Sequence, residues 1–134
     1  MSGEKNLSIL LKKMKPELNT GDFVFCTVSE KFKIDLSKII GSFNEKEGPT
    51  LILSKAYADE LNLEYSSSMS WITLQVHSSL EAVGLTAAFS KVLAENNISC
   101  NVVAGYYHDH ISVIKKDAEK AIELLSSFYK SIFQ

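Results

Sequence analysis

Arginine is absent from this chain of 134 residues, and all 14 basic residues are lysines. The guanidinium group of arginine binds phosphates and base edges in a bidentate way that lysine cannot reproduce. The formal net charge is also slightly negative, at -2. We therefore expect no nucleic-acid partner.

Cysteine is scarce, and neither cysteine stands in a metal-binding or disulfide motif. Cys26 lies in FVFCTV and Cys100 lies in ISCNVV, and both stretches are apolar and strand-like. Cysteines in such stretches are usually reduced core residues. The chain has no CxxC pair, so the sequence does not indicate a zinc site built from cysteine.

No apolar run is long enough to cross a bilayer, so we expect no membrane-spanning helix. The opening sequence MSGEKNLSILLKKMKP has neither a continuous apolar region nor a small-residue cleavage site, which favours a cytoplasmic protein without a secretory signal. The nucleophile motif G-x-S-x-G, the phosphate-binding loop and the dinucleotide fingerprint are also missing. We expect a non-catalytic protein with no cofactor.

The first half of the chain contains a helix and two apolar extended stretches. Apolar residues recur every three or four positions before Pro16, which predicts a short helix with Leu7, Leu10, Leu11 and Met14 on one face. The stretches FVFCTV and TLILSK predict strands, and AYADELNL predicts a brief helix. The charged segment between the two strands predicts a long irregular connection.

The second half has clearer periodicity. In WITLQVH, apolar residues alternate with Trp71 and three polar residues, which predicts a strand whose buried face holds Ile72, Leu74 and Val76. A long helix follows, with Leu85, Phe89, Val92 and Leu93 on one stripe. The next predicted strand, residues 98–107, would point Ile98, Cys100, Val102 and Ala104 inward. After a turn at HDH come a short strand and a helix whose stripe is Ala118, Ile122, Leu125, Phe128 or Tyr129, and Ile132.

The order of these elements suggests a duplicated unit. LILSKAYADEL and SVIKKDAEKAIEL both run from a strand through lysine into a helix that contains alanine. The second unit reads β-α-β-β-α, which is one strand short of a ferredoxin-like βαββαβ plan. We expect an α+β protein with antiparallel sheets and two interlocked lobes, residues 1–64 and 65–134, in which the missing strand comes from LEYSSSM or from the other lobe.

Gly84 near the start of the long helix is the most informative single residue. Ser78 and Glu81 have the spacing of a capping box, which would begin the helix. A glycine within the first turns costs about 1 kcal/mol relative to alanine, so it usually marks close packing or the close approach of a ligand. Both explanations fit, and the amide groups at a helix N-terminus could bind a carboxylate.

The sequence resembles ACT domains, which are small βαββαβ modules that regulate proteins by binding amino acids. The glycine–helix–strand signature GLTAAFSKVLAENNISCNVV carries this resemblance. FVFCTV, EKEGPTLIL, ITLQVHSSLEAVGLTAAFS and CNVVAGYYHDH together resemble short, stand-alone bacterial proteins built from tandem ACT-like units. Where ACT domains commonly have Asp-x-Pro-Gly, this chain has Glu81-Ala82-Val83-Gly84.

The resemblance implies an amino-acid site at an interface between units or subunits. One side would be the loop and helix start, namely Ser78, Ser79, Leu80, Glu81, Ala82, Val83, Gly84 and Leu85. The other side would be the second strand of a neighbour, namely Asn97, Ile98, Ser99, Cys100, Asn101 and Val102. We also predict that His77, His108, Asp109 and His110 line the pocket.

The sequence also allows three other interpretations. His108 and His110 would share a strand face and could bind a metal with Asp109 or His77; because no third ligand has a defined spacing, a histidine-based metal-binding protein is the weaker alternative and no metal ligands are assigned. A Ser–His–Asp hydrolase has no nucleophile elbow to support it. The remaining alternative is an interaction module without a ligand, because Trp71 on a polar strand face would be buried by a second subunit or by the other lobe; we expect a homodimer.

Overall fold

The computed structural model describes residues 6–76 and 83–130, and packing divides the chain into two compact units. Unit 1 consists of residues 1–19 and 70–134, and unit 2 consists of residues 20–69. The two lobes predicted from sequence, 1–64 and 65–134, were defined by a repeated order of elements and not by packing. They stay a prediction. By packing, the first 19 residues belong with the second half of the chain.

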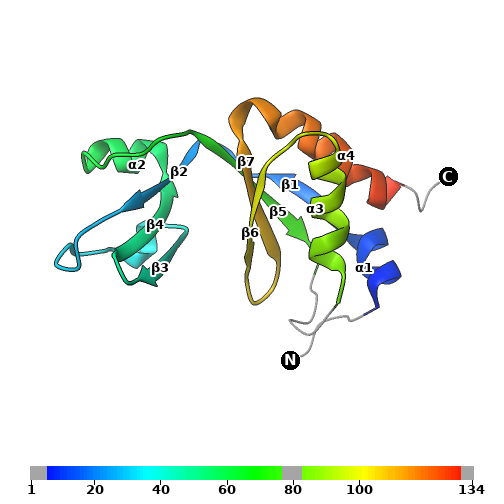
Figure 1. Cartoon of the computed structure of the whole chain (residues 1–134), viewed down its shortest axis with the longest axis horizontal. Helices are drawn as coiled ribbons and strands as arrows, with labels where there is room; N and C mark the ends of the chain where they lie inside the picture. Colours follow the sequence, from blue (N-terminus) through cyan, green and yellow to red (C-terminus); the bar gives the residue numbers. More distant parts are fainter. Residues whose placement is uncertain (1–5, 77–82, 131–134) are drawn as a thin grey trace. The chain divides into compact units, whose positions relative to one another are not determined.

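Unit 1 follows the βαββαβ plan, with its last strand taken from the N-terminal region (Figure 1). Its sheet has the order β1-β5-β7-β6, and the β1/β5 and β6/β7 pairs are antiparallel. The predicted α+β class is therefore confirmed. The elements are α1 (Leu7–Lys13), β1 (Lys15–Leu18), β5 (Met69–Gln75), α3 (Leu85–Glu95), β6 (Cys100–Ala104), β7 (Asp109–Ile114) and α4 (Ala118–Lys130).

Strand β1 was not predicted, and it supplies the strand that the second half lacks. Asn6 caps α1 by accepting a hydrogen bond from the Ile9 amide at 3.2 Å. Pro16 disfavours helical backbone at the residue before it, so the chain is extended from Lys15 onward. Residues 15–18 then pair with residues 75–72 of β5. The strand is short and mostly exposed, so it has no buried face that periodicity could reveal.

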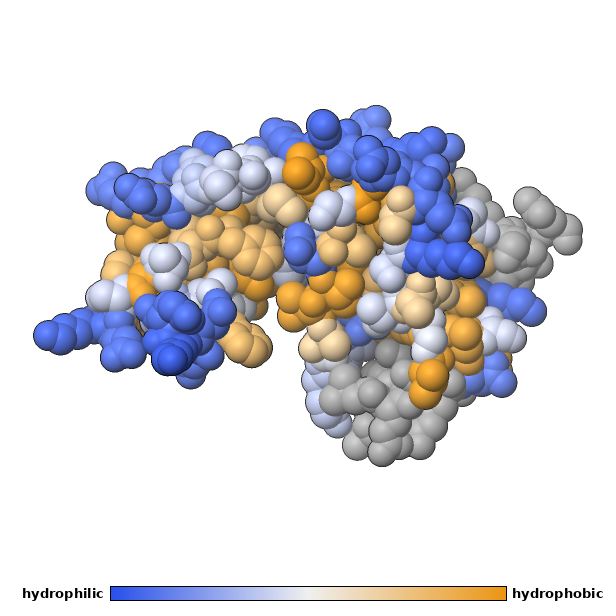
Figure 2. Space-filling model, viewed as in Figure 1, coloured by the Kyte–Doolittle hydropathy of each residue, from blue (hydrophilic) through white to orange (hydrophobic). Residues whose placement is uncertain are grey.

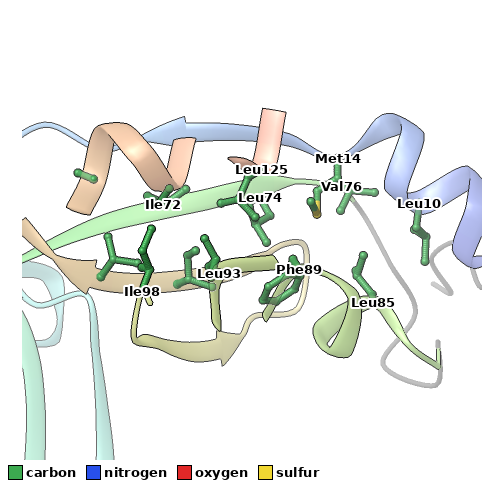
Figure 3. Packing of buried hydrophobic residues seen from close by; sticks show 14 residues of the cluster. Leu10, Met14, Ile72, Leu74, Val76, Leu85, Phe89, Leu93, Ile98 and Leu125 are labelled. Atoms are coloured by element: carbon green, nitrogen blue, oxygen red, sulfur yellow. The ribbon is translucent and has the colours of Figure 1, made fainter. Parts of the chain in front are cut away.

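The core of unit 1 lies between the sheet and helices α1, α3 and α4 (Figure 3). The predicted faces of β5 and α3 are confirmed, because Ile72, Leu74 and Val76 are buried together with Leu85, Phe89 and Leu93, while Val92 is half-buried. Helix α1 adds Leu10, and Met14, which follows the helix as its C-cap, is fully buried as well. Helix α4 buries Ala118, Ala121 and Leu125, with Ile122 and Phe128 partly buried; Ile132 lies outside the described residues.

The β6–β7 hairpin differs from the prediction at both strands. Its turn runs from Gly105 to His108 and is closed by a 2.9 Å hydrogen bond from the Gly105 amide to the His108 carbonyl. Asp109 and His110 therefore lie on β7 and not at the tip. On β6, Val102 and Ala104 are exposed, because α3 covers only the start of this edge strand.

Unit 2 is built around a smaller sheet with its own core. Strands β2 (Phe23–Thr27), β3 (Gly41–Glu45) and β4 (Gly48–Ser54) form the order β3-β4-β2, and Met69 at the start of β5 pairs with Phe23. Helix α2 (Lys55–Glu60) begins at Ser54, whose hydroxyl accepts a hydrogen bond from the Tyr57 amide. The core cluster consists of Val24, Cys26, Val28, Leu51, Leu53 and Ala58.

The connection between β2 and β4 was predicted to be irregular, and this is wrong for residues 41–45. Strand β3 pairs with β4 from Gly41↔Ile52 to Glu45↔Gly48. It is an edge strand with mostly exposed side chains, so backbone hydrogen bonds define it without an alternating apolar pattern. The rest of the connection contains one 3₁₀ turn, Leu36–Lys38, where a complete βαββαβ unit would have its first helix.

The outward surface of α4 is mainly hydrophilic (Figure 2). Lys115, Lys116, Glu119, Lys120 and Glu123 are exposed there or just before the helix. Among residues 6–76 and 83–130, no helix has both the length and the apolar character needed to cross a bilayer.

Candidate functional site

Gly84 begins α3 in a left-handed backbone conformation, with φ of +96°. A Cβ atom at this position would lie 3.0 Å from Cδ2 of Leu7, so this methyl group of α1 would have to shift to make room for a side chain. Left-handed backbone and close packing are therefore enough to require glycine here. The predicted capping residues Ser78 and Glu81 lie outside the described residues, as do Ser79, Leu80 and Ala82.

The two predicted halves of the site lie at opposite ends of α3. Gly84 and Leu85 stand at its start, whereas Asn97 to Val102 follow its last residue. A helix of 11 residues is about 16 Å long. Within one unit the two segments therefore cannot contact one small molecule together.

An open groove of about 550 Å³ runs along α3 beside the start of β6. Three predicted site residues, Ile98, Ser99 and Cys100, form one wall. Asn97, Asn101 and Val102 are exposed nearby but do not line it. The other wall was not predicted and consists of Ala87, Ser90, Lys91 and Ala94. These four residues recur at i, i+3, i+4 and i+7, which is the spacing of one face of a helix. This wall could therefore have been predicted as the outward face of the amphipathic helix.

The groove combines an apolar floor with a few polar groups. Lys91 provides a cation, and its Nζ lies 3.9 Å from a carboxylate oxygen of Glu95 with both side chains largely exposed, which makes this a weak pair. Burial raises the pKa of the Cys100 thiol, so thiolate chemistry is disfavoured. Such a surface can hold a small carboxylate with an apolar side chain, and it presents no acid–base pair.

Unit 2 has a smaller hollow of about 300 Å³, lined by residues that include Asp22, Lys55 and Asp59. Nζ of Lys55 lies 3.1 Å from Asp59, and the Tyr65 hydroxyl donates to the same carboxylate at 2.6 Å. Because the charges of Lys55 and Asp59 already satisfy each other, this hollow is a weaker candidate than the groove along α3.

The histidine-rich segment does not line the groove. His108 ends the hairpin turn, Asp109 is buried on β7, and His110 lies half-buried on β7; His77 is outside the described residues. Along the strand Asp109 and His110 point to opposite faces. Among the described residues, no group of three His, Cys, Asp or Glu side chains is placed to hold a metal.

His110 instead packs against Trp71. The two rings are nearly parallel, with their centroids 5.8 Å apart, and Nδ1 of His110 lies 3.0 Å from Oγ1 of Thr73. Trp71 is 5% exposed. A residue of its own unit therefore covers part of this tryptophan, without a second subunit.

Asp109 makes a testable contribution to stability. Burial raises the pKa of its carboxyl above the ordinary 3.8, although His110 and His108 act in the opposite direction. A raised pKa in the folded state means that stability is lost as pH rises through that pKa. We expect Asp109→Asn to stabilise the protein at pH 7 by on the order of 1 kcal/mol, with the gain disappearing below the unfolded pKa. Urea unfolding at several pH values measures this.

Glu47→Gln is the control, because it removes one carboxylate from an exposed turn. It should change the free energy of unfolding little at any pH. Lower stability of Asp109→Asn at pH 7 would mean that the ionised carboxylate has a stabilising partner.

Comparison with known proteins agrees with this architecture. Residues 2–70 match one ACT-domain family model, and residues 66–127 match another. A Vibrio cholerae protein of unknown function, described as a possible transport protein, is 52% identical, with a TM-score of 0.82 over 93% of this chain and 97% of that one. A search of curated proteins found no match.

Two more distant structures share the fold. An Agrobacterium tumefaciens protein is 17% identical with a TM-score of 0.71, covering 87% of this chain and 90% of that one. The ligand-free regulatory subunit of Thermus thermophilus aspartate kinase is 8% identical with a TM-score of 0.60, covering 88% and 99%.

Proposed function

Because this chain belongs to the ACT-domain family, whose members are typically regulatory modules that bind small molecules, we propose that it binds an amino acid in the groove between α3 and β6. The carboxylate of the ligand would meet Lys91, and its side chain would pack against Ala87, Ala94 and Ile98. The proposal includes no catalytic step. Its main support is the groove itself, which three residues of the predicted site help to form.

A second copy of the chain would complete the site. The groove is open on its outer side, and the amide groups at the start of α3 lie at the far end of the same helix. In a two-fold dimer, that segment of the partner could approach the groove and contact the ligand. The homodimer is therefore part of the proposal, and binding should strengthen association.

The test is thermal unfolding of the pure protein against each of the 20 amino acids. A ligand at 100 times its Kd adds about 2.7 kcal/mol of stability if it binds only the folded state. We expect a selective shift for one amino acid or one chemical class. Ala94→Phe, which fills the groove from an exposed helical position, should abolish that shift.

Thr86→Phe is the matched control, because Thr86 is exposed on the same helix but does not line the groove. It should keep the ligand-dependent shift. Replacement of Gly84 is not a useful test, because any other residue would strain the left-handed backbone and so destabilise the fold regardless of binding. If no amino acid shifts the unfolding temperature at millimolar concentration, the sensor proposal fails and the interaction module without a ligand becomes the better explanation.

A further inference from the structure

Asn19, which directly follows β1, is bound to β5 by three hydrogen bonds. Its backbone amide donates to the Trp71 carbonyl at 2.9 Å. Its side-chain nitrogen donates to the same carbonyl and to Oγ1 of Thr73, at 3.0 Å in each case. Because a carbonyl oxygen can only accept, the Asn19 atom that faces it must be the amide nitrogen, and both of its hydrogens are used. Oγ1 of Thr73 therefore accepts a hydrogen bond from Asn19.

The hydroxyl of Thr73 has one hydrogen to donate, and Nδ1 of His110 lies 3.0 Å from Oγ1. In a neutral imidazole one ring nitrogen accepts and the other donates. If Nδ1 donated, Oγ1 would accept twice, and these contacts would leave the hydroxyl hydrogen without an acceptor. The chain from Asn19 through Thr73 to His110 is complete when Nδ1 accepts, which places the ring proton on Nε2. It therefore favours a neutral His110.

The closest surroundings of the His110 ring are uncharged. The ring stacks on Trp71 with centroids 5.8 Å apart, and Val103 lies opposite it on β6. A Cβ atom at Gly105 would lie 3.3 Å from Nε2, so the turn leaves little room on that side. The indole face of Trp71 would attract an imidazolium, so burial and the hydrogen-bond chain are the features that favour the neutral ring.

Three titratable groups of the described residues lie near this ring. Burial lowers the pKa of His110 below the ordinary 6.5, and His108 acts in the same direction, whereas Asp109 opposes them. On β1, Glu17 lies opposite Thr73, and its carboxylate accepts a hydrogen bond from Gln75. The carboxylate that β1 presents to this face is therefore already bound by another side chain.

We propose that His110 is a proton-sensitive latch, which holds Asn19 against β5 while the ring is neutral and releases it when Nδ1 takes up a proton. Protonation turns Nδ1 into a donor, so Oγ1 of Thr73 faces two donors and its own hydrogen loses its acceptor. The contacts of Asn19 then weaken, and the end of β1 separates from β5. The latch lies within unit 1, shares no residue with the groove along α3 and is independent of the proposed ligand.

The pH range of the latch follows from proton linkage. The pKa of His110 is lower in the folded protein than the ordinary 6.5, so the latch contributes its full stability above pH 6.5. This contribution is lost as the pH falls through the folded pKa. Opening takes up one proton, so the opening equilibrium changes by up to about tenfold per pH unit within this range.

Nitrogen-15 NMR of the histidine rings in the unmodified chain is the first test, and at neutral pH His110 should carry its proton on Nε2. Amide hydrogen exchange is measured in the same samples. The protection factor of the Asn19 amide should fall by up to about tenfold per pH unit as the pH drops below 6.5. The Ile98 amide, which donates to the Leu93 carbonyl at the end of α3, is the internal control and should keep its protection.

Three results in the unmodified chain would overturn the proposal. One is a ring proton on Nδ1 of His110 at neutral pH. Another is a titration of His110 that leaves the protection of Asn19 unchanged. The third is a ring that stays neutral until the whole protein unfolds, because the latch would then never open in the folded state.

Two variants separate His110 from its titratable neighbours. His110→Phe keeps an aromatic ring beside Trp71 but cannot titrate, so the protection of Asn19 should become independent of pH in this range. Thr73→Val removes the hydroxyl at similar volume and should raise the pKa of His110 towards 6.5, because the neutral ring loses its hydrogen bond. A pH dependence that persists in His110→Phe would belong to Asp109 or His108 and would contradict the latch.

Thr27→Val is the matched control, because it makes the same substitution at an exposed position of β2. It should leave the titration of His110 unchanged. Circular dichroism must show that each variant is folded, and the measurements on the unmodified chain decide the proposal if one is not.

Discussion

Deleting residues 1–19 should prevent unit 1 from folding. The deletion removes strand β1 together with Leu10 and Met14, which are fully buried in the unit 1 core. Loss of one large buried side chain costs about 2–5 kcal/mol, and a small protein has only about 5–15 kcal/mol of stability in total. The amide resonances of residues 83–130 should therefore lose their dispersion in an NMR spectrum of a chain that begins at Thr20.

Adding the missing segment as a separate peptide is the control for this deletion. A synthetic peptide of residues 6–19 should restore dispersion, because it again supplies the strand and the two apolar side chains. The same peptide with Leu10→Ser and Met14→Ser should fail, since it keeps the backbone but not the core contacts. Well-dispersed resonances in the truncated chain alone would show that residues 70–134 fold without β1.

Phe89→Ala should have the largest effect of any single substitution in unit 1. Phe89 is fully buried on α3 and lies among residues from the sheet and the other helices (Figure 3). Truncating a buried phenylalanine costs about 3–5 kcal/mol, from lost transfer free energy and from the cavity left behind. Urea unfolding monitored by circular dichroism measures the change in free energy.

Val92→Ala is the comparison for Phe89→Ala, because Val92 sits on the same helix and is only half-buried. It should cost clearly less, about 1 kcal/mol or below. Equal losses in the two variants would contradict core packing as the cause, because both substitutions raise helix propensity and only burial distinguishes the two positions.

Periodicity predicted the elements that have one buried face. Strand β5 and helix α3 were recognised because their apolar residues recur at the spacing of a half-buried strand or helix. Strands β1 and β3 were missed because they lie at sheet edges, and backbone pairing holds them while most of their side chains face solvent. The β6–β7 turn was misplaced because Tyr106 and Tyr107 read as strand residues although they stand in the turn.

The candidate site was predictable only on one side. Ile98, Ser99 and Cys100 were identified through the family resemblance, and they do line the groove. The wall from α3 was not predicted, because small residues such as Ala87 and Ala94 carry no signal of their own. They can be assigned to the groove only once the buried face of the helix is known. The contacts of Asn19 with Trp71 and Thr73 join residues more than 50 positions apart, and no local pattern in the sequence encodes them.

Unit 1 is built from two stretches that are separated in the sequence by unit 2, so its parts are synthesised at different times. Helix α1 and strand β1 leave the ribosome before their partner β5, which follows only after the residues of unit 2. Because translation proceeds at about 5–20 residues per second, the apolar face of α1 stays without its core partners for several seconds. Unit 2 is contiguous in the chain and can complete its own core during that interval. Leu10 and Met14 are then exposed apolar surface on a nascent chain, where a chaperone or a neighbouring chain could bind them before β5 emerges.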